Sequence, residues 1–486
     1  MAAAASVATA LPWTSRAAGP LPVLDDYDDG NQRIPGGLAG DPERVIVIGA
    51  GFGGLTAANA LGNAGVPCVV VEGRDRLGGR AHTVDVGGAP VDLGCSWITD
   101  PIGNPMTRFA TRAGVAQTNA AIELDVPTSR FFDERTGVVA PPFTAAAAGH
   151  ALLFEQEGPN ISAALGPLAS TKDGILYYAN EHRLSGDARR RGEFFMRLVT
   201  ELPDATDWDK DSLKAWADYS SPYYGFGQGD FPRGGYRRII RALGSGADVR
   251  FGLRVTDVIT EARGVRVRSV DAAGRSTDLL GSHVVVTAPL GVLKSRSIRF
   301  SPQLPAAKLG AIDRLGFGVF EKVVMRFAEP YWATEHTHIF HLSHPNPMRF
   351  PLIVDYFHLE AVPALVAFNV GSYGITLGGL SDAEVRRRML DVLREVQGAP
   401  IPRPTDVAIT RWRGDPFSRG SYSYIAVGAT PADQRELAKP ADGRVLFAGE
   451  ASSTARFGYA DGALSTGIRE AKRLLRRASV TLTPGR

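Results

Sequence analysis

Three glycines in the pattern G-x-G-x-x-G, Gly49, Gly51 and Gly54, are the residues whose spacing most directly indicates chemistry. The first permits a tight turn, the second lets a phosphate approach backbone N–H groups, and the third lets a helix pack closely on a strand. Glu72, further along the chain, is placed to accept hydrogen bonds from an adenosine ribose. The pattern predicts a dinucleotide site, and NAD, NADP and FAD all satisfy it.

The residues around these glycines have the patterns of the elements that must position them. Val45 to Ile48 is β-branched throughout and predicts a buried strand, and the small apolar residues after Gly54 predict a helix. The N-terminus of that helix would offer N–H donors and a positive dipole end to a diphosphate. A second strand, Val69 to Val71, would end at Glu72. The sequence therefore predicts an α/β fold with a strand–turn–helix–strand unit near its start.

The stretch that begins at Glu72, EGRDRLGGR, decides between the cofactors because it resembles the signature after the second strand in FAD-dependent amine oxidases. The resemblance implies FAD, a Rossmann-like (GR2-type) FAD-binding domain and an interleaved α+β substrate domain. Arg74, Gly79 and Arg80 would lie beside the diphosphate, where two arginines supply positive charge. Ser421 stands where monoamine oxidases carry their flavin-attaching cysteine, which implies that FAD is bound non-covalently.

Several later segments are similar to the same family and imply further contacts with FAD. VDLGCSWI, from Val91, resembles a flavin-contacting strand and turn, and a helix that begins near Ala460 would direct its positive end at the flavin. The additional FAD-binding residues that the resemblance implies are Ser96, Trp97, Val255, Trp412, Glu450 and Ala460.

Three residues match catalytic positions of the family. Lys322 lies in the apolar stretch LGFGVFEKVVMRF, where a lysine is costly to bury without a partner. The resemblance implies that Lys322 holds a water near flavin N5. Tyr422 and Tyr459 would form two aromatic walls around the amine, and these walls serve the family in place of a general-base carboxylate.

The implied reaction is hydride transfer from the α-carbon of an amine to flavin N5, reoxidation by O2 to hydrogen peroxide, and hydrolysis of the imine to an aldehyde. Residues 409–429 resemble polyamine oxidases and lysine-specific histone demethylases more than monoamine oxidases, which favours a polyamine-like substrate. Asp461, and Thr99 with Asp100, stand where polyamine oxidases carry histidines, so spermine specificity is not implied. An L-amino-acid oxidase, an oxidase of a secondary-metabolite amine and a flavin-holding structural module with little turnover remain alternatives.

The resemblance occurs in separate blocks, which predicts domains built from several segments. Residues 1–40 are expected to form a flexible extension. Residues 41–120, 231–300 and 405–476 are expected to form a composite FAD-binding domain, and residues 121–230 and 301–404 the substrate-binding domain.

Composition excludes several other classes of protein. The chain has 486 residues, is 44% hydrophobic and carries a net charge of only +3 with scattered basic residues, so no nucleic-acid partner is expected. Two cysteines cannot form a disulfide framework, and no apolar run is long enough to predict a transmembrane helix. The first 20 residues resemble the later part of an export signal but lack its basic start; a cytoplasmic location is favoured and export remains an alternative.

Two polar clusters are expected to be structural. Asp204, Asp207, Asp209 and Asp211 could attract a polycation, although a solvated loop is the favoured interpretation. A second cluster, His336, His338, His341 and His344, has no carboxylate or cysteine pattern to complete a metal site, so no metal is expected.

Overall fold

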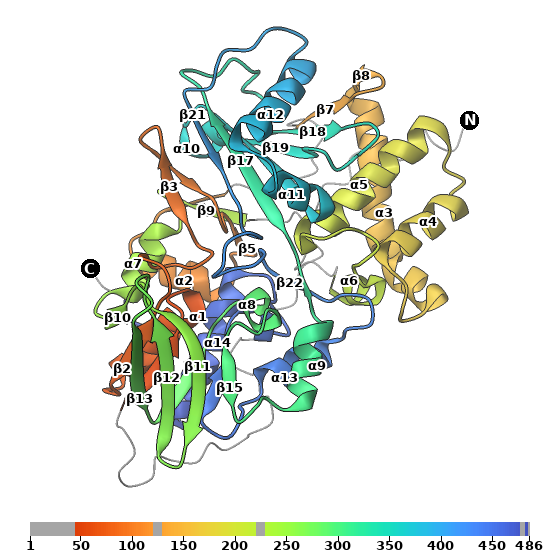
Figure 1. The fold of residues 1–486 in the computed structure, drawn as a ribbon. Helices are drawn as coiled ribbons and strands as arrows, with labels where there is room; N and C mark the ends of the chain where they lie inside the picture. The colour runs from red at the N-terminus through yellow and green to blue at the C-terminus, as the bar shows by residue number, and fades with distance from the viewer. Residues whose placement is uncertain (1–43, 120–128, 220–228, 477–481, 485–486) are drawn as a thin grey trace.

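The computed structural model describes residues 44–119, 129–219, 229–476 and 482–484. A parallel sheet of five strands carries the glycine turn, in the order β10-β2-β1-β14-β23 (Figure 1). Its strands are β1 (Val45–Ile48), β2 (Cys68–Val71), β10 (Val249–Arg250), β14 (His283–Val286) and β23 (Val445–Phe447). The residues of β1 are buried, as expected for a parallel strand covered on both faces. The predicted α/β fold is confirmed.

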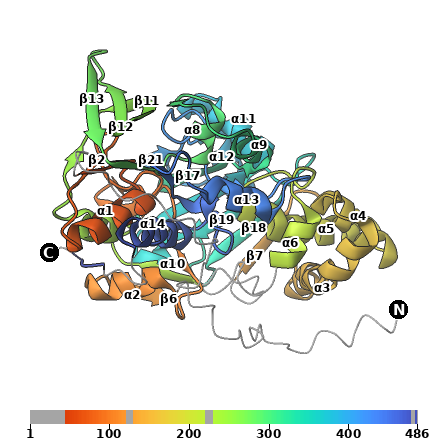
Figure 2. The same ribbon diagram turned by 90° about the horizontal axis from the view of Figure 1, so that it is seen from below.

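Helices α1 (Phe52–Asn63) and α14 (Ala460–Leu475) pack side by side on this sheet (Figure 2). They approach closely because glycines meet at their contact. A Cβ on Gly467 would lie 2.4 Å from the carbonyl oxygen of Gly53. The first and last described helices therefore both start at the same edge of the sheet.

A mixed sheet lies beside the parallel one, in the order β13-β12-β11-β15 (Figure 1). Its strands are β11 (Arg254–Glu261), β12 (Gly264–Val270), β13 (Ser276–Gly281) and β15 (Arg299–Ser301). They pair in antiparallel fashion except β11 and β15, which are parallel. Residues 231–300 thus contribute strands to both of these sheets.

A seven-stranded sheet forms the core of the other half of the molecule, in the order β21-β17-β20-β19-β18-β7-β8. Its strands are β7 (Ser129–Asp133), β8 (Gly137–Val138), β17 (Phe320–Arg326), β18 (His338–Leu342), β19 (Leu352–Asp355), β20 (Ala364–Val370) and β21 (Asp406–Ile409). The last strand lies within residues 405–476, which were expected to belong to the FAD-binding domain. Pairing of β21 with β17 places it in the other sheet instead.

A group of helices from the first substrate segment packs beside the seven-stranded sheet (Figure 1). These helices are α3 (Pro141–Leu165), α4 (Thr171–Glu181), α5 (Gly186–Asp204) and α6 (Leu213–Tyr219). The other helices are α2 (Pro105–Arg112), α7 (Arg237–Gly244), α8 (Leu290–Lys294), α9 (Ala306–Arg314), α10 (Tyr356–Glu360), α11 (Gly371–Gly378), α12 (Asp382–Gln397) and α13 (Pro431–Ala438). Among the described residues, no helix combines the length and apolarity needed to cross a membrane.

Three small sheets connect the larger layers. Their strands are β3 (Thr83–Val86) with β4 (Ala89–Asp92), β5 (Ile98–Thr99) with β9 (Gly229–Pro232) and β6 (Gln117–Asn119), and β16 (Gly316–Phe317) with β22 (Ser423–Tyr424). The predicted extension, residues 1–40, lies outside the described residues, as do residues 120–128 and 220–228 of the predicted substrate segment.

Candidate active site

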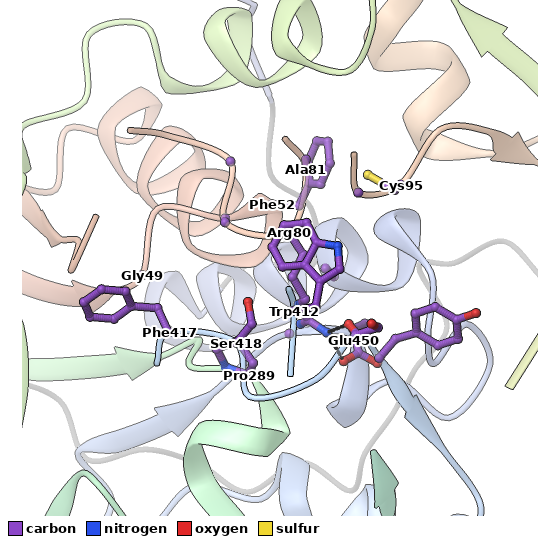
Figure 3. A pocket seen from close by; sticks show the side chains of 18 of the residues that line it. Gly49, Phe52, Arg80, Ala81, Cys95, Pro289, Trp412, Phe417, Ser418 and Glu450 are labelled. Carbon is purple, nitrogen blue, oxygen red and sulfur yellow. Dashed lines mark hydrogen bonds and ion pairs between the residues drawn. The ribbon is translucent and has the colours of Figure 1, made fainter. Parts of the chain in front are cut away.

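A cavity of about 580 Å³ is lined by residues of both large sheets (Figure 3). Every predicted site residue except Gly54 lines it. The lining residues among those predicted are Gly49, Gly51, Glu72, Arg74, Gly79, Arg80, Ser96, Trp97, Val255, Lys322, Trp412, Tyr422, Glu450, Tyr459 and Ala460. Residues that are far apart in the sequence therefore meet in one place.

The glycine turn shapes one end of the cavity. Gly49 has a φ of +101°, a conformation that favours glycine, and a Cβ there would lie 2.6 Å from Oγ1 of Thr287. Gly54 acts through packing, since its Cβ would lie 1.9 Å from the carbonyl oxygen of Gly49. At Gly51 a Cβ would meet nothing closer than the Gly78 carbonyl oxygen at 3.8 Å. The space beside Gly51 therefore belongs to the cavity.

Two helices begin at the cavity without a side-chain cap. Gly51 is the N-cap of α1 and Tyr459 is the N-cap of α14, and no side chain among the described residues caps either of them. Backbone N–H groups at both helix starts are therefore available to an anionic ligand. A dinucleotide with a diphosphate and an electron-accepting ring fits this donor set.

Charged residues from the predicted FAD signature surround these donors. The Glu72 carboxylate accepts hydrogen bonds from the backbone N–H groups of Ala50, at 2.7 Å, and Arg74, at 2.8 Å. It thereby joins the end of β2 to the glycine turn. Arg74 donates to Asp415 at 2.8 Å, and Arg80 donates to Glu450 at 2.8 Å. Both arginines are thus oriented by carboxylates while they line the cavity.

Lys322 lies on β17 and donates three hydrogen bonds. Its Nζ contacts the Asp92 carbonyl oxygen at 2.9 Å, the Gly94 carbonyl oxygen at 2.7 Å and Ser96 Oγ at 2.6 Å. Burial lowers the pKa of Lys322 to about 8, and the neighbouring Asp92 acts in the opposite direction. The lysine therefore fixes the turn that carries Ser96 and Trp97.

Asp92 is a titratable residue next to the site whose role was not predicted from the sequence. Its side chain is fully buried and accepts hydrogen bonds from Thr83 Oγ1 and from the backbone N–H of Tyr236. Burial raises the pKa of Asp92 to about 6. The sequence signal was its position in the VDLG segment, where a charged residue interrupts an apolar strand.

The two predicted tyrosines lie on neighbouring segments. Tyr422 Oη donates to the Leu202 carbonyl oxygen at 2.8 Å, and a Cβ on Gly458 would lie 3.4 Å from Cδ2 of Tyr422. Glu450 links both segments, because it accepts from Ser423 Oγ at 2.6 Å and from the Gly458 backbone N–H at 2.9 Å. Burial raises the pKa of both tyrosine hydroxyls. Glu450 therefore sets the spacing of the aromatic walls as well as the position of Arg80.

The two tryptophans close other sides of the cavity. Trp97 makes edge-to-face contacts with Phe231 and Phe368. Trp412 donates from Nε1 to the Leu93 carbonyl oxygen at 3.3 Å, and its backbone N–H is held by Glu321 at 3.1 Å. Each tryptophan thus contacts one residue of the predicted FAD-binding segments and one residue of the predicted substrate-binding segments.

The acidic loop before α6 differs from the expectation of a solvated loop. Asp211 is 2% exposed, and its Oδ2 has no hydrogen-bond partner among the described residues. Asp204 is partly buried, and burial raises its pKa to about 7. Asp207 pairs with Lys210 at 2.6 Å, and Asp209 is exposed. The expectation is wrong for Asp204, which is the last residue of α5, and for Asp211, which forms an isolated β-bridge with the distant residue Ala426.

The histidine cluster does not gather in one place. His341 lies near Glu134 and Glu395, whose ligand atoms fall within 4.8 Å of one another. Sequence reasoning did not connect these acids with His341. Arg349 already contacts Glu134 and lies 3.5 Å from Glu395, so a cation of the chain already pairs with both acids of this group.

Comparison with known proteins places the chain among flavoenzymes. The model of the family described as flavin containing amine oxidoreductase matches residues 52–475. Lysine-specific histone demethylase 1 homolog 1 of Oryza sativa subsp. japonica is 32% identical over 455 residues, which cover 90% of this chain and 53% of the relative. Protein FLOWERING LOCUS D of Arabidopsis thaliana is 33% identical over an alignment that covers 89% of this chain and 55% of the length of that relative.

The chain thus spans about half the length of these curated relatives. A solved structure of putrescine oxidase bound to putrescine has a TM-score of 0.73 and 20% sequence identity, covering 90% of this chain and 99% of the other. This structural likeness confirms the predicted Rossmann-like fold.

Proposed function

This chain belongs to the flavin containing amine oxidoreductase family, with FAD as its cofactor, and we propose that it oxidises an amine, a polyamine-like one by preference. In the proposed reaction the α-carbon of the amine loses a hydride and the resulting imine is hydrolysed to an aldehyde and an amine or ammonia. O2 takes up the two electrons and becomes hydrogen peroxide. Bound FAD supplies the two-electron acceptor that connects these half-reactions.

The observation that carries this proposal is the convergence of Tyr422, Tyr459 and Lys322 on the cavity at which α14 begins. The two rings provide apolar walls for an amine, and the open helix start favours a negative charge that develops on the acceptor. Intact residues at these positions argue against a structural module without turnover.

Lys322 and Ser96 have a shared role in this proposal. Lys322 donates to Ser96 Oγ at 2.6 Å, whereas the acceptors within reach of the Ser96 hydroxyl proton are distant, at 3.4 Å for Asp92 O and 3.5 Å for Gly94 O. The Ser96 hydroxyl also contacts Tyr356, and Ser96 lines the cavity. It can hold a water or a substrate nitrogen in a fixed place while Lys322 keeps its oxygen oriented.

Anaerobic mixing with candidate substrates tests the proposal. The FAD-loaded protein is mixed with polyamines, monoamines and L-amino acids, and loss of the visible flavin absorbance is followed. We expect rapid bleaching by amines, with polyamines fastest. Bleaching by amino acids alone would contradict the proposal in favour of an amino-acid oxidase, and no bleaching at full FAD occupancy would favour a non-enzymatic role.

The preference for polyamines is supported by the buried acids near Tyr422. Asp204 follows Leu202 and Pro203, which line the cavity, and its carboxyl, although outside the lining, is close enough to act on the hydroxyl of Tyr422. Burial raises the pKa of Asp204, and a second ammonium group of the substrate would favour its ionised form. The solved putrescine oxidase, which was bound to a diamine, has the same fold.

The ratio of kcat/KM for putrescine to kcat/KM for butylamine is expected to rise with pH from weakly acidic to weakly basic solution. Burial raises the pKa of the Asp204 carboxyl above its ordinary range, so this carboxyl ionises at a higher pH than an exposed aspartate. Only the ionised form attracts the second ammonium of putrescine, which butylamine lacks. Asp204→Asn should lower the ratio at pH 8 by about 10- to 100-fold, as for a charge-assisted hydrogen bond, and remove its pH dependence.

Asp209→Asn provides the matched control, because Asp209 is an exposed acid in the same loop. This control should keep the wild-type ratio and its rise with pH. A wild-type slope in Asp204→Asn would remove Asp204 from substrate selection.

A further inference from the structure

Arg456 is a buried cation close to the candidate active site, and the proposed reaction does not yet use it. Its side chain is 6% exposed and lies among two carboxylates. Nε donates to Asp461 at 2.7 Å and Nη1 donates to Asp100 at 2.8 Å. Nη2 also donates to the Thr99 carbonyl oxygen at 3.1 Å. We call Arg456, Asp461 and Asp100 the arginine cluster.

The arginine cluster joins three segments that carry cavity residues. Asp461 is in the first turn of α14, Asp100 follows β5, and Arg456 lies in the loop before Tyr459. Asp100 has a φ of 50°, a left-handed conformation that is uncommon outside glycine. The ion pair with Arg456 holds the Asp100 carboxylate against the loop before α14.

The guanidinium of Arg456 also lies over the ring of Tyr459, with Cζ at 4.5 Å from the ring centroid. Tyr459 lines the cavity, whereas Arg456 does not. The arginine therefore contacts the Tyr459 ring without itself lining the cavity. A cation over an aromatic face uses the negative potential of the ring.

A ring that is already engaged by one cation attracts a second cation less strongly. An ammonium group between Tyr422 and Tyr459 would compete with Arg456 for the electron density of Tyr459. An uncharged amine does not meet this cost. The carboxylates of Asp461 and Asp100 keep the arginine ionised and in place but do not line the cavity.

We propose that Arg456 is a specificity-determining positioning residue that acts through Tyr459 and makes the amine site select the uncharged form of the amine. This inference rests on the proposed amine oxidation. It identifies Arg456 as the residue that determines which charge state of the amine is bound. A second ammonium bound elsewhere, such as near Asp204, is not affected by it.

Competitive inhibition by an isosteric pair of compounds tests the inference without relying on turnover of the probes. Choline carries a permanent positive charge, and 3,3-dimethylbutan-1-ol has the same shape without charge. Their inhibition constants are measured against the best amine from the substrate panel, in the FAD-loaded protein and at fixed pH. The readout is the ratio of the choline constant to the alcohol constant.

Arg456→Met should lower this ratio about tenfold, because removal of the cation frees the Tyr459 ring for choline. Arg456→Lys keeps a positive charge and should stay close to the wild-type ratio. A merely structural role of Arg456 would change both inhibition constants together and leave the ratio constant, which would overturn the inference. The same low ratio in Arg456→Lys and Arg456→Met would also overturn it.

A double variant separates the ring from the net charge of the arginine cluster. Arg456→Met alone leaves two unpaired carboxylates, which would themselves attract choline. Arg456→Met with Asp461→Asn has the same formal charge as the wild-type cluster. If the effect acts through Tyr459, the double variant keeps the low ratio, whereas a return to the wild-type ratio would contradict that route.

Failure of the inference and failure of the proposed function give different results. Amine-dependent bleaching with an unchanged inhibition ratio in Arg456→Met would remove Arg456 from selection and leave amine oxidation intact. No bleaching of the FAD-loaded protein by any amine would overturn the proposed function and, with it, the inference that rests on it.

Discussion

Gly51→Ala is expected to weaken FAD binding on the order of a hundredfold while the apoprotein keeps its thermal stability. Gly51 has a φ of −84°, which alanine adopts without strain, and the added methyl would meet protein atoms only at 3.8 Å. The methyl would instead occupy the cavity beside the uncapped start of α1, where the diphosphate needs close approach to backbone N–H groups. A hundredfold change corresponds to about 3 kcal/mol of binding free energy.

FAD titration of the apoprotein, followed by flavin fluorescence, measures this effect, and thermal unfolding of the same sample measures the fold. Gly62→Ala is the matched control, since Gly62 is in the same helix and a Cβ there would meet nothing within 4 Å. It should bind FAD normally and gain up to about 1 kcal/mol of stability from better helix propensity. Wild-type affinity in Gly51→Ala would show that the cofactor does not lie against this turn.

Lys322→Met is expected to slow at least one half-reaction, flavin bleaching by amine or its reversal by O2, by about 100-fold or more. Methionine preserves the length of the side chain but cannot donate to Ser96 or to the two carbonyl oxygens of the 92–94 turn. The Ser96 hydroxyl then loses its fixed orientation at the cavity. Stopped-flow absorbance resolves the two half-reactions separately.

Lys308→Met is the control for the loss of a buried lysine. Lys308 is 1% exposed, compared with 4% for Lys322, and also donates to three oxygens, the carbonyls of Glu436, Leu437 and Lys439. It does not line the cavity. Both variants should lose stability, and only Lys322→Met should lose rate. Wild-type rate constants for both half-reactions in Lys322→Met would exclude Lys322 from the mechanism.

The glycine turn and the elements around it could be predicted from sequence because local residues determine them. The β-branched run of β1, the G-x-G-x-x-G spacing and the acid at the end of β2 lie within 30 residues, and backbone geometry permits few alternatives. The resemblance to a family then identified lining residues as distant as Glu450 and Ala460.

The polar connections between segments could not be predicted, since each depends on tertiary contacts. Lys322 meets the Asp92 carbonyl 230 positions away, and Glu450 meets Arg80 and Gly458 from opposite directions in the sequence. The hydrophobic pattern of the sequence also did not indicate that Asp211 is buried, because a run of acidic residues usually predicts a solvent-exposed loop. Arg456 had no distinguishing motif, and its ion pairs became evident only from the arrangement of the first turn of α14, the loop before it and the segment after β5.

We propose that an amine is oxidised at FAD between Tyr422 and Tyr459. The most direct test is anaerobic stopped-flow bleaching of the wild-type protein and of the double variant Tyr422→Ala/Tyr459→Ala, both with FAD bound, by the best amine of the panel. We predict saturable bleaching in the wild type and a rate reduced on the order of 100-fold in the variant, which lacks the walls that orient the amine. Bleaching of the variant at the wild-type rate, or no bleaching of the FAD-loaded wild type by any amine, would contradict the claim.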